Sequence, residues 1–292
     1  MFFRTDMAVE RRDLYRTANK LEDEIKGIEC EEEKIDDITV TRVKITNEDG
    51  ERALDKRRGN YVTIDVKKIN NITTEKEEQI INTFSKELNS IIGKHVNKNE
   101  EILIVGLGNL YSTPDSLGSK VVQNIEITRH IKIYLPNAID KNTRSVSAIT
   151  PGVLGTTGIE TVEIVRGIVD NIKPKLVIAI DSLCSKNIDR INKSIQISDT
   201  GIVPGGGVGN RQAELSERTL NIPVISVGIP TVLDAATIVI DTLNACDMIV
   251  DENEIVDKMK LNNFNFIVTP KEIDSLIENM TNIVSEGINM SL

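Results

Sequence analysis

Residues 101–118, EILIVGLGNLYSTPDSLG, decide the fold of this 292-residue chain. The uninterrupted apolar run at 102–105 is typical of a strand that is buried on both faces of a sheet. Gly-Leu-Gly-Asn follows at 106–109, where glycine lets the backbone turn sharply or approach a bound group. Thr113 and Pro114 then indicate a helix start, which places Asp115 in the first turn. The segment therefore predicts a strand, a loop and a helix, with an acid at the end of the strand.

Short apolar runs of the same kind recur further along the chain and alternate with helical stretches. The runs are IKIYL at 131–135, LVIAI at 176–180, SIQIS at 194–198 and PVISVG at 223–228. The helical stretches between them are 113–127, 157–172, 182–192 and 230–245. This alternation predicts an α/β fold, with a mostly parallel central sheet flanked by helices.

The two ends of the chain add other elements to this core. Charge-dense runs within 1–36 indicate a solvated helix face or a mobile arm. At 38–46 and 61–66, β-branched residues alternate with polar ones, and residues typical of turns lie at 47–50, which predicts an antiparallel β-ribbon. A helix is expected from Thr74 to about Lys94. A helix start at 269–272 opens a C-terminal amphipathic helix. We expect one domain in three portions: 37–98, a catalytic core over 100–246, and a helical portion over 250–292.

The composition argues against a nucleic-acid-binding, a membrane-spanning or a secreted protein. Lys plus Arg number 35 and Asp plus Glu 45, so the net charge is 35 − 45 = −10, which argues against a nucleic-acid partner. No apolar run reaches the roughly 20 residues of a membrane helix, and the three cysteines lie far apart. We expect a soluble, cytoplasmic protein without a signal peptide. With two histidines and no tryptophan, catalysis would have to rely on carboxylates.

A second acid, Asp181, follows the apolar run at 176–180 and would lie at the same sheet edge as Asp115. Two nearby carboxyl groups can share one proton, so that one serves as acid and the other as base. Such a pair could activate water against a peptide carbonyl. Both residues could instead be helix caps, and spacing alone favours that interpretation, because any loop between a strand and a helix can carry a capping Asp. Cys184 could be a nucleophile if His130 reached it, but we interpret it as a small core residue.

The glycine-rich segment SDTGIVPGGGVGN at 198–210 lacks the Gly-Lys-Ser/Thr ending of a phosphate loop. It could be a flexible connection, a lid, or a surface that lets an extended substrate approach the backbone. We therefore take Gly205, Gly206 and Gly207, together with Thr156 and Thr157, as candidate substrate-binding residues. A dinucleotide site is not expected, because Tyr111 occupies the position of the third glycine.

Nine blocks, in order over nearly the whole chain, resemble the germination protease family of spore-forming bacteria. They are RTDMAVE (4–10), GNYVTIDV (59–66), VGLGNLYSTPDSLG (105–118), TRH (128–130), ITPGVLGTTGIET (149–161), VIAIDSL (177–183), IQISDTGIVPGGGVGN (195–210), GIPTVLDA (228–235) and FIVTPKEID (266–274).

The resemblance implies an atypical aspartic endopeptidase with a phosphorylase/hydrolase-like core, similar to hydrogenase-maturation peptidases. Its catalytic aspartates would be Asp115 and Asp181, and it would need no cofactor and no metal. Its substrates would be small acid-soluble, DNA-protecting spore proteins, which it begins to degrade during germination in the spore core. It would act as a homotetramer, without direct contact to nucleic acid or membrane. It would be made in the forespore as a zymogen that cuts itself between Asp6 and Met7, which separates a propeptide at 1–6 from a peptidase domain at 7–292.

Three alternatives remain open at this point. A nickel-dependent hydrogenase-maturation peptidase also has a G-x-G-N loop, and Asp115 and Asp181 could be metal ligands in it. Peptidyl-tRNA hydrolase shares the GLGN motif but requires a histidine after that loop and a basic surface. A noncatalytic binding protein could use the same sheet.

Overall fold

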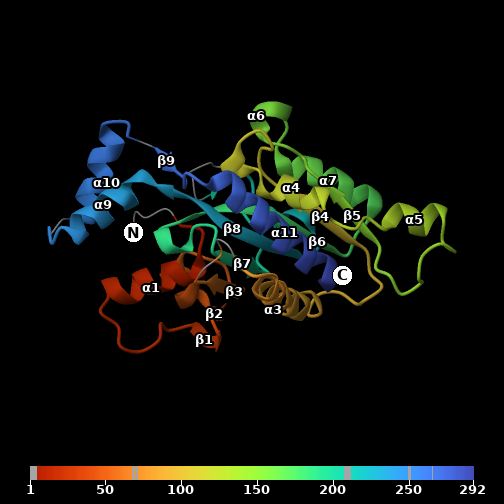
Figure 1. The fold of residues 1–292 in the computed structure, drawn as a ribbon, viewed down its shortest axis with the longest axis horizontal. Helices are drawn as coiled ribbons and strands as arrows, with labels where there is room; N and C mark the ends of the chain where they lie inside the picture. The colour runs from red at the N-terminus through yellow and green to blue at the C-terminus, as the bar shows by residue number, and fades with distance from the viewer. Residues whose placement is uncertain (1–4, 68, 70–71, 207–211, 249–250, 265) are drawn as a thin grey trace.

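The computed structural model describes all residues except 1–4, 68, 70–71, 207–211, 249–250 and 265, and in that part of the chain nine strands form one sheet (Figure 1). The strands are β1 (Ile28–Ile35), β2 (Ile38–Ile45), β3 (Gly59–Val66), β4 (Ile102–Gly106), β5 (Val146–Ile149), β6 (Leu176–Ser185), β7 (Ser194–Ser198), β8 (Val224–Asp234) and β9 (Ile267–Val268). Their order is β1-β2-β3-β7-β8-β6-β4-β5, and β9 pairs with β8.

Helices cover both faces of this sheet. They are α1 (Ala8–Ala18), α2 (Glu48–Leu54), α3 (Thr74–Ile92), α4 (Leu117–Gln123), α5 (Arg129–Tyr134), α6 (Leu154–Thr157), α7 (Thr161–Ile172), α8 (Glu217–Leu220), α9 (Ala235–Ala245), α10 (Glu252–Leu261) and α11 (Ile273–Ser291), with short 3₁₀ turns η1 (Thr113–Asp115) and η2 (Ile188–Arg190). The main core joins α3, α4 and α11 to one face, through residues such as Phe84, Leu117 and Ile277. A second core joins α7 and α8 to the other face, through Val165 and Leu220. The prediction of a sheet flanked by helices is confirmed.

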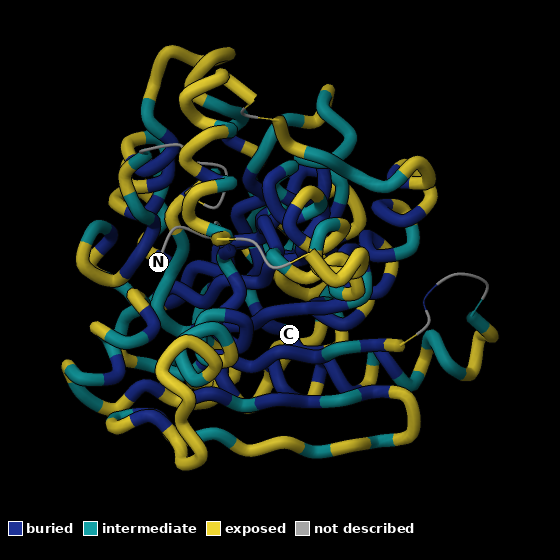
Figure 2. Tube along the Cα trace, turned by 90° about the vertical axis from the view of Figure 1, so that its left-hand side faces the viewer, coloured by how far each residue is buried: buried dark blue, intermediate teal, exposed yellow. Residues whose placement is uncertain are grey.

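The sheet is parallel in only one half. Pairings β4 with β5, β4 with β6, and β6 with β8 are parallel. The pairings β1 with β2, β2 with β3, β3 with β7, and β7 with β8 are antiparallel. The prediction of a mostly parallel sheet therefore holds for the half that contains β4 and β6, while β7 joins the N-terminal ribbon to it. Figure 2 shows the buried strands at the centre of the molecule and exposed segments around them.

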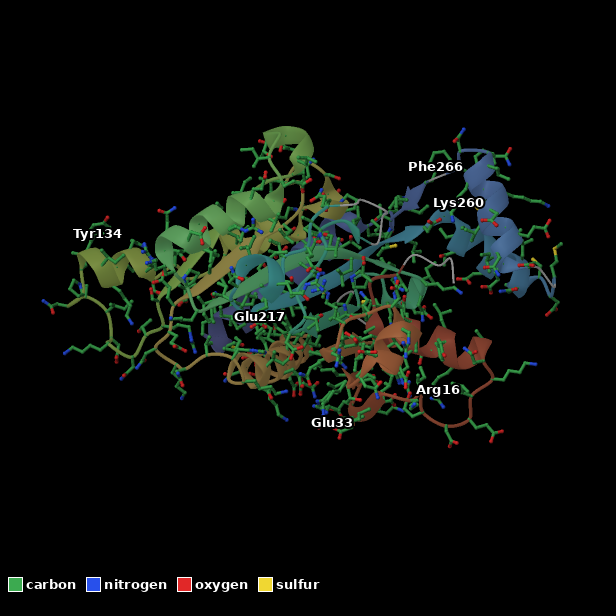
Figure 3. The ribbon with its side chains drawn as sticks, turned by 180° about the vertical axis from the view of Figure 1, so that it is seen from behind. Arg16, Glu33, Tyr134, Glu217, Lys260 and Phe266 are labelled. Carbon is green, nitrogen blue, oxygen red and sulfur yellow. The ribbon has the colours of Figure 1, made fainter. Side chains whose placement is uncertain are left out.

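The apolar run at 131–135 is not a strand, contrary to expectation. It forms helix α5 and the residue that follows it, and three of its side chains, Ile133, Tyr134 and Leu135, are exposed. Tyr134 lies at one end of the molecule and points away from it (Figure 3). Strand β5 takes the place beside β4, and its Val146 pairs with Ile102 of β4. Apolar composition alone could not distinguish these two segments.

The N-terminal ribbon also differs from the prediction. The charged segment Ile28–Ile35, expected as a helix face or mobile arm, is the edge strand β1 and pairs with β2 along its whole length. Residues 47–50 do not form a hairpin turn, because the Asn47 side chain caps α2 by accepting hydrogen bonds from the N–H groups of Asp49 and Gly50. Helix α3 begins at Thr74 as predicted. Over the described ranges, no helix combines the length and apolar character needed to cross a bilayer.

Strands β6 and β8 are longer than expected, and this changes the setting of Asp181. The stretch 182–192 was expected to be helical, but β6 continues to Ser185 and only η2 follows it. The last pair between β4 and β6 joins Gly106 to Ile180. Asp181 therefore lies inside a strand, at the point where the neighbouring strand β4 has ended.

Candidate active site

Asp115 is held at the end of β4 by the loop that follows this strand. The Asn109 N–H donates to the Asp115 carbonyl oxygen at 2.9 Å and to Asp115 Oδ2 at 3.0 Å. Gly108 has φ +94°, and a Cβ atom there would lie 2.0 Å from the Asp115 carbonyl oxygen. Only glycine fits this close approach, so the GLGN loop fixes the position of Asp115.

Two further glycines bring the helix after Asp115 directly onto the sheet. A Cβ atom at Gly106 would lie 2.2 Å from the Gly118 carbonyl oxygen, and one at Gly118 would lie 2.4 Å from the Ile180 carbonyl oxygen. The Leu107 N–H donates to that same Ile180 oxygen at 2.8 Å. Helix α4 therefore starts against the backbone of β6, one residue before Asp181.

Asp181 is almost completely buried, with 3% of its surface exposed. Its Oδ1 accepts a hydrogen bond from the Ser182 N–H at 2.9 Å, and its carboxyl group also accepts one from the Gly205 N–H. Across the sheet it pairs with Gly228 of β8, which has no side chain to cover it.

The structure brings Asp115 and Asp181 together in the wall of one cavity of about 360 Å³. Asp6, from the segment predicted to be cleaved, lines the same cavity. The remaining lining residues are Leu107, Gly108, Ser112, Pro114, Gly152, Val153, Thr161, Ser182, Cys184, Pro204, Gly205, Gln212, Thr231, Val232, Ile267 and Thr269. A groove therefore joins the two aspartates, as the predicted acid/base pair requires.

Burial raises the pKa of both carboxyl groups, and repulsion by neighbouring carboxylates adds to this effect at Asp181. Burial raises the pKa of Asp115 to about 6, although the hydrogen bond from the Asn109 N–H favours its ionised form. Burial raises the pKa of Asp181 well above its usual value, and the charges of Asp115 and Asp6 raise it further. The pair therefore has one carboxyl group that ionises near neutral pH and one that holds its proton more tightly.

Threonine hydroxyls complete the cavity, and the sequence interpretation did not identify them as site residues. Thr231 is completely buried, and its Oγ1 donates to the Pro114 carbonyl oxygen at 2.6 Å. Thr269 Oγ1 in turn donates to the Thr231 carbonyl oxygen at 2.9 Å. Both residues occur in the blocks GIPTVLDA and FIVTPKEID that carry the family resemblance, which was the signal available for them.

The candidate substrate-binding residues have different positions. Gly205 lines the cavity of the aspartates, and Gly206 lines a neighbouring cavity. Gly207 lies outside the described residues. Thr156 and Thr157 are exposed on α6, and both hydroxyls donate to the Val153 carbonyl oxygen. Val153 lines the cavity of the aspartates, so these threonines support its wall from outside.

Cys184 lines the cavity but is not arranged as a nucleophile. Burial and the nearby Asp6 carboxyl group raise the pKa of its thiol to about 12, so it stays protonated. His130 is exposed on α5. The interpretation of Cys184 as a small buried residue fits these positions.

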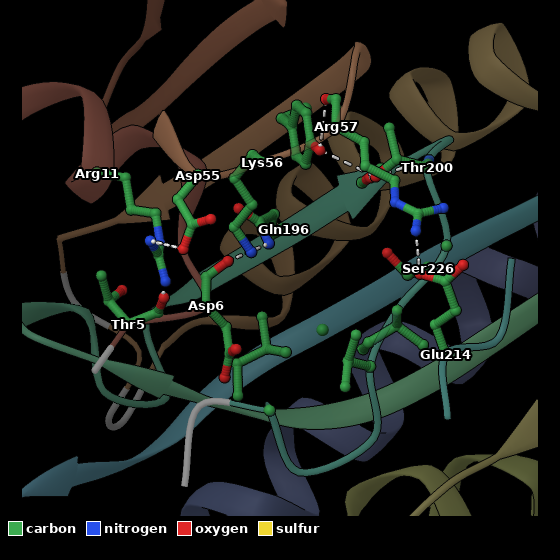
Figure 4. A pocket seen from close by; sticks show the side chains of 18 residues that line it. Thr5, Asp6, Arg11, Asp55, Lys56, Arg57, Gln196, Thr200, Glu214 and Ser226 are labelled. Atoms are coloured by element: carbon green, nitrogen blue, oxygen red, sulfur yellow. Dashed lines mark hydrogen bonds and ion pairs between the residues drawn. The ribbon is translucent and has the colours of Figure 1, made fainter. Parts of the chain in front are cut away.

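Asp6 separates the cavity of the aspartates from a second cavity of about 510 Å³, which Figure 4 shows. The Asp6 N–H donates to the Cys184 carbonyl oxygen at 2.9 Å, and the Cys184 N–H donates to Asp6 Oδ2 at 2.9 Å. The next two residues, Met7 and Ala8, are completely buried. The predicted cleavage sequence thus lies on the sheet as an extended segment beside Asp181.

A sequence model of the germination protease family, a family of peptidases, matches residues 5–251, a range that contains Asp6, Asp115 and Asp181. The chain belongs to the germination protease family. A germination protease from Clostridium tetani is 43% identical over 317 aligned residues, covering 100% of this chain and 96% of that protein. Germination proteases from Caldanaerobacter subterraneus and Bacillus cereus are 43% and 37% identical, each covering 99% of this chain and 94% and 93% of those proteins.

Among solved structures, the hydrogenase maturation protease HycI from Thermococcus kodakarensis aligns with a TM-score of 0.34 and 13% identity, covering 68% of this chain and 98% of that one. The family match and the curated relatives support a germination protease rather than the hydrogenase-maturation alternative. Among the described residues, no group of three or more His, Cys, Asp or Glu side chains is arranged to hold a metal ion.

Proposed function

We propose that this germination protease hydrolyses peptide bonds with water activated between Asp115 and Asp181. The observation that carries this proposal is that both carboxyl groups line one cavity and have pKa values raised to different extents. Pairs of carboxyl groups whose pKa values are driven apart in this way suit general acid/base catalysis.

The different extents of these pKa shifts support one assignment of the two roles. Above pH 6, Asp115 is ionised and takes a proton from water, whose oxygen then attacks the carbonyl carbon of the peptide. Asp181, which keeps its proton, donates it to the leaving nitrogen as the C–N bond breaks. The products are an amine and a carboxylic acid, and one proton passes from Asp115 back to Asp181 before the next cycle.

The first substrate in this proposal is the chain itself. Hydrolysis between Asp6 and Met7 would release residues 1–6 as a propeptide and leave a peptidase that starts at Met7. Support comes from the position of Asp6, which lines the cavity of Asp115 and Asp181 while the segment is intact. A precursor of this kind has its own chain in the wall of the cavity, where it would hinder the approach of other substrates.

The substrates in trans are small acid-soluble, DNA-protecting spore proteins, degraded when spores germinate. This part of the proposal rests on the membership of the chain in the family and on the resemblance of its nine sequence blocks to that family. On the same basis we place the enzyme in the forespore and spore core, as a homotetramer that requires no cofactor.

The test is to incubate the purified protein with a small acid-soluble spore protein and to identify fragments by mass spectrometry. We expect cleavage by the wild type, and a loss of several orders of magnitude in Asp115→Asn and Asp181→Asn. Asp170→Asn is the matched control, because Asp170 is exposed on α7. Cleavage at the wild-type rate by either site variant would refute the proposal, provided that each variant unfolds at a temperature similar to the wild type.

A further inference from the structure

The side chain of Gln196 holds the backbone on both sides of the Asp6–Met7 bond. Its Nε2 donates to the Asp6 carbonyl oxygen at 3.1 Å, and its Oε1 accepts from the Ala8 N–H at 2.7 Å. These two partners also fix which way the amide points, because a carbonyl oxygen can only accept and an N–H can only donate. Gln196 is buried in β7, with 6% of its surface exposed. A buried primary amide thus spans the peptide bond predicted to be cleaved.

The sheet places Gln196 in line with Asp181. In the strand register, Gln196 of β7 pairs with Gly228 of β8, and Gly228 pairs with Asp181 of β6. Residues paired in this way point to the same face of a sheet, and two strand spacings separate Gln196 from Asp181 by about 10 Å. The residue between them is glycine, which adds no side chain of its own to this face.

Apolar packing holds the N-terminal segment beside Gly228. A Cβ atom at Gly228 would lie 2.5 Å from the Leu183 side chain, so Leu183 occupies the space that glycine leaves. Leu183 packs against Met7 and Val9 in a small buried cluster. The residue after the predicted cleavage point is therefore fixed by apolar contacts, and the carbonyl before it is fixed by Gln196.

The two ends of Asp6 face different groups. Its carboxyl group accepts from the Cys184 N–H and affects the pKa of Asp181. Its carbonyl oxygen faces the second cavity, where the side chains of Gln196 and Lys56 converge on Asp6 (Figure 4). Lys56 forms no side-chain hydrogen bond or ion pair with another described residue, whereas Arg11 in the same cavity pairs with Asp55 and Arg57 pairs with Glu214.

We propose that Gln196 is a catalytic residue for cleavage of the chain's own Asp6–Met7 bond, and that it donates a hydrogen bond to the oxyanion formed on the Asp6 carbonyl oxygen. This inference rests on the proposed function of Asp115 and Asp181. When water adds to the carbonyl carbon, the C=O π electrons move onto that oxygen, and the bond from Nε2 strengthens because its acceptor becomes charged. The positive charge of Lys56 stabilises the same oxygen. When the C–N bond breaks, the carbonyl re-forms and the Met7 nitrogen leaves with the proton from Asp181.

The test follows the loss of residues 1–6 from the full-length protein by intact-mass spectrometry. Gln196→Glu is the decisive variant, because a carboxylate can still accept from the Ala8 N–H but cannot donate to the Asp6 oxygen. We expect processing to slow by about 100-fold, the usual effect of removing one oxyanion donor. Gln196→Met, of similar length and without either hydrogen bond, should be at least as slow. Ser226→Ala, a change in the wall of the same cavity, is the control.

The possible outcomes separate this inference from the proposed function. If the wild type is processed, Asp115→Asn is inert, and folded Gln196→Glu and Gln196→Met are processed at the wild-type rate or faster, Gln196 is not the donor and only this inference fails. If the wild type stays intact, or Asp115→Asn is processed normally, the proposed function fails and this inference fails with it. Thermal unfolding of each variant shows whether a slow rate reflects a folded protein.

Discussion

The Thr231 hydroxyl donates a hydrogen bond to the Pro114 carbonyl oxygen at 2.6 Å, and this contact ties the turn that carries Asp115 to the middle of β8. Thr231 is completely buried. The Thr269 hydroxyl holds the backbone of Thr231 from the other side. The position of the Asp115 carboxyl group therefore depends on a strand that follows it by more than a hundred residues in the chain.

Replacing Thr231 should reveal this dependence. Thr231→Val keeps the shape of the side chain but leaves the Pro114 oxygen without its donor, which costs about 1–3 kcal/mol of stability. We expect kcat to fall more than KM rises, because Asp115 is displaced while the rest of the cavity is kept. Thr231→Ser restores the hydroxyl and should recover most of kcat. A Ser variant as impaired as the Val variant would show that the methyl group matters, and not the hydrogen bond.

The pH dependence of activity should follow the two carboxyl groups. If Asp115 is the base, as proposed, kcat/KM should fall as pH falls through about 6, where Asp115 becomes protonated. The charge of Asp6 raises the pKa of Asp181, the proposed acid. Without Asp6, Asp181 should lose its proton at a lower pH, so a protein that starts at Met7 should lose activity at a lower alkaline pH than the full-length precursor. For the precursor, the measured rate is that of its own processing. For the shorter protein, it is the rate of cleavage of an added peptide. Identical alkaline limbs would contradict the role of Asp6.

Asp115 should also make folding stability depend on pH. Its pKa is raised from 3.8 to about 6 in the folded protein, so the folded state binds the proton more tightly than the unfolded state between these values. The contribution of Asp115 to the free energy of unfolding is therefore fully present below pH 4 and is lost as pH rises toward 6. Asp115→Asn should have a higher Tm than the wild type at pH 7.5, with a smaller difference at pH 4. The exposed Asp170→Asn control should show no such trend.

The close contact of α4 with the sheet should tolerate no side chain at Gly118. The Cβ atom of Gly118→Ala would lie 2.4 Å from the Ile180 carbonyl oxygen, a backbone atom that cannot rotate away. We expect a loss of about 1–3 kcal/mol or more in urea unfolding, the usual cost of overpacking. Gly167→Ala is a matched control, because a Cβ atom at Gly167, within α7, meets nothing within 4 Å. It should stabilise the protein by up to about 1 kcal/mol.

Glu10 should anchor the N-terminal segment on which processing depends. It is 4% exposed, and its carboxylate accepts from the Lys186 N–H at 2.7 Å and the Asn187 N–H at 3.2 Å, with Arg190 at 3.4 Å. Glu10→Gln would turn an N–H₂ group toward these donors and leave Arg190 without this partner, at a cost of about 3 kcal/mol. Faster proteolysis near α1 would report the loosened segment. The exposed Glu22→Gln serves as the comparison.

Much of the parallel half of the sheet could be predicted from the sequence, because strands buried on both faces have uninterrupted apolar runs such as 102–105 and 176–180. The same rule was wrong for 131–135, which is as apolar but lies exposed on α5, since a run of five residues does not show whether a neighbouring strand is available. It also missed β1, whose glutamates hide a strand in which only Ile28 is buried. Edge strands of this kind are set by pairing with β2, which only the fold reveals.

The two aspartates could be predicted because Asp181 directly follows one apolar run and Asp115 lies in the helix start after another, at the same edge of the sheet. Gln196 and Thr231 could not be identified as site residues, although they lie in conspicuous sequence blocks. Gln196 acts on Asp6, 190 positions earlier, and Thr231 acts on Pro114, 117 positions earlier. Contacts over such separations depend on strand order, and β7 in particular runs antiparallel to β8, which the alternating pattern led us to expect as a parallel partner.

Strand β1 has a consequence for how the molecule meets its own copies. It forms one edge of the sheet and contains glutamates at positions 29, 31, 32 and 33. An open edge could template the addition of another chain, which is how sheets grow into aggregates. Lys44 pairs with Glu29, Arg42 with Glu33 and Lys34 with Glu32, so a second copy approaching with the same edge would meet a row of charged side chains. Charged side chains along an open edge discourage the addition of another strand, so β1 ends the sheet without offering a ready template.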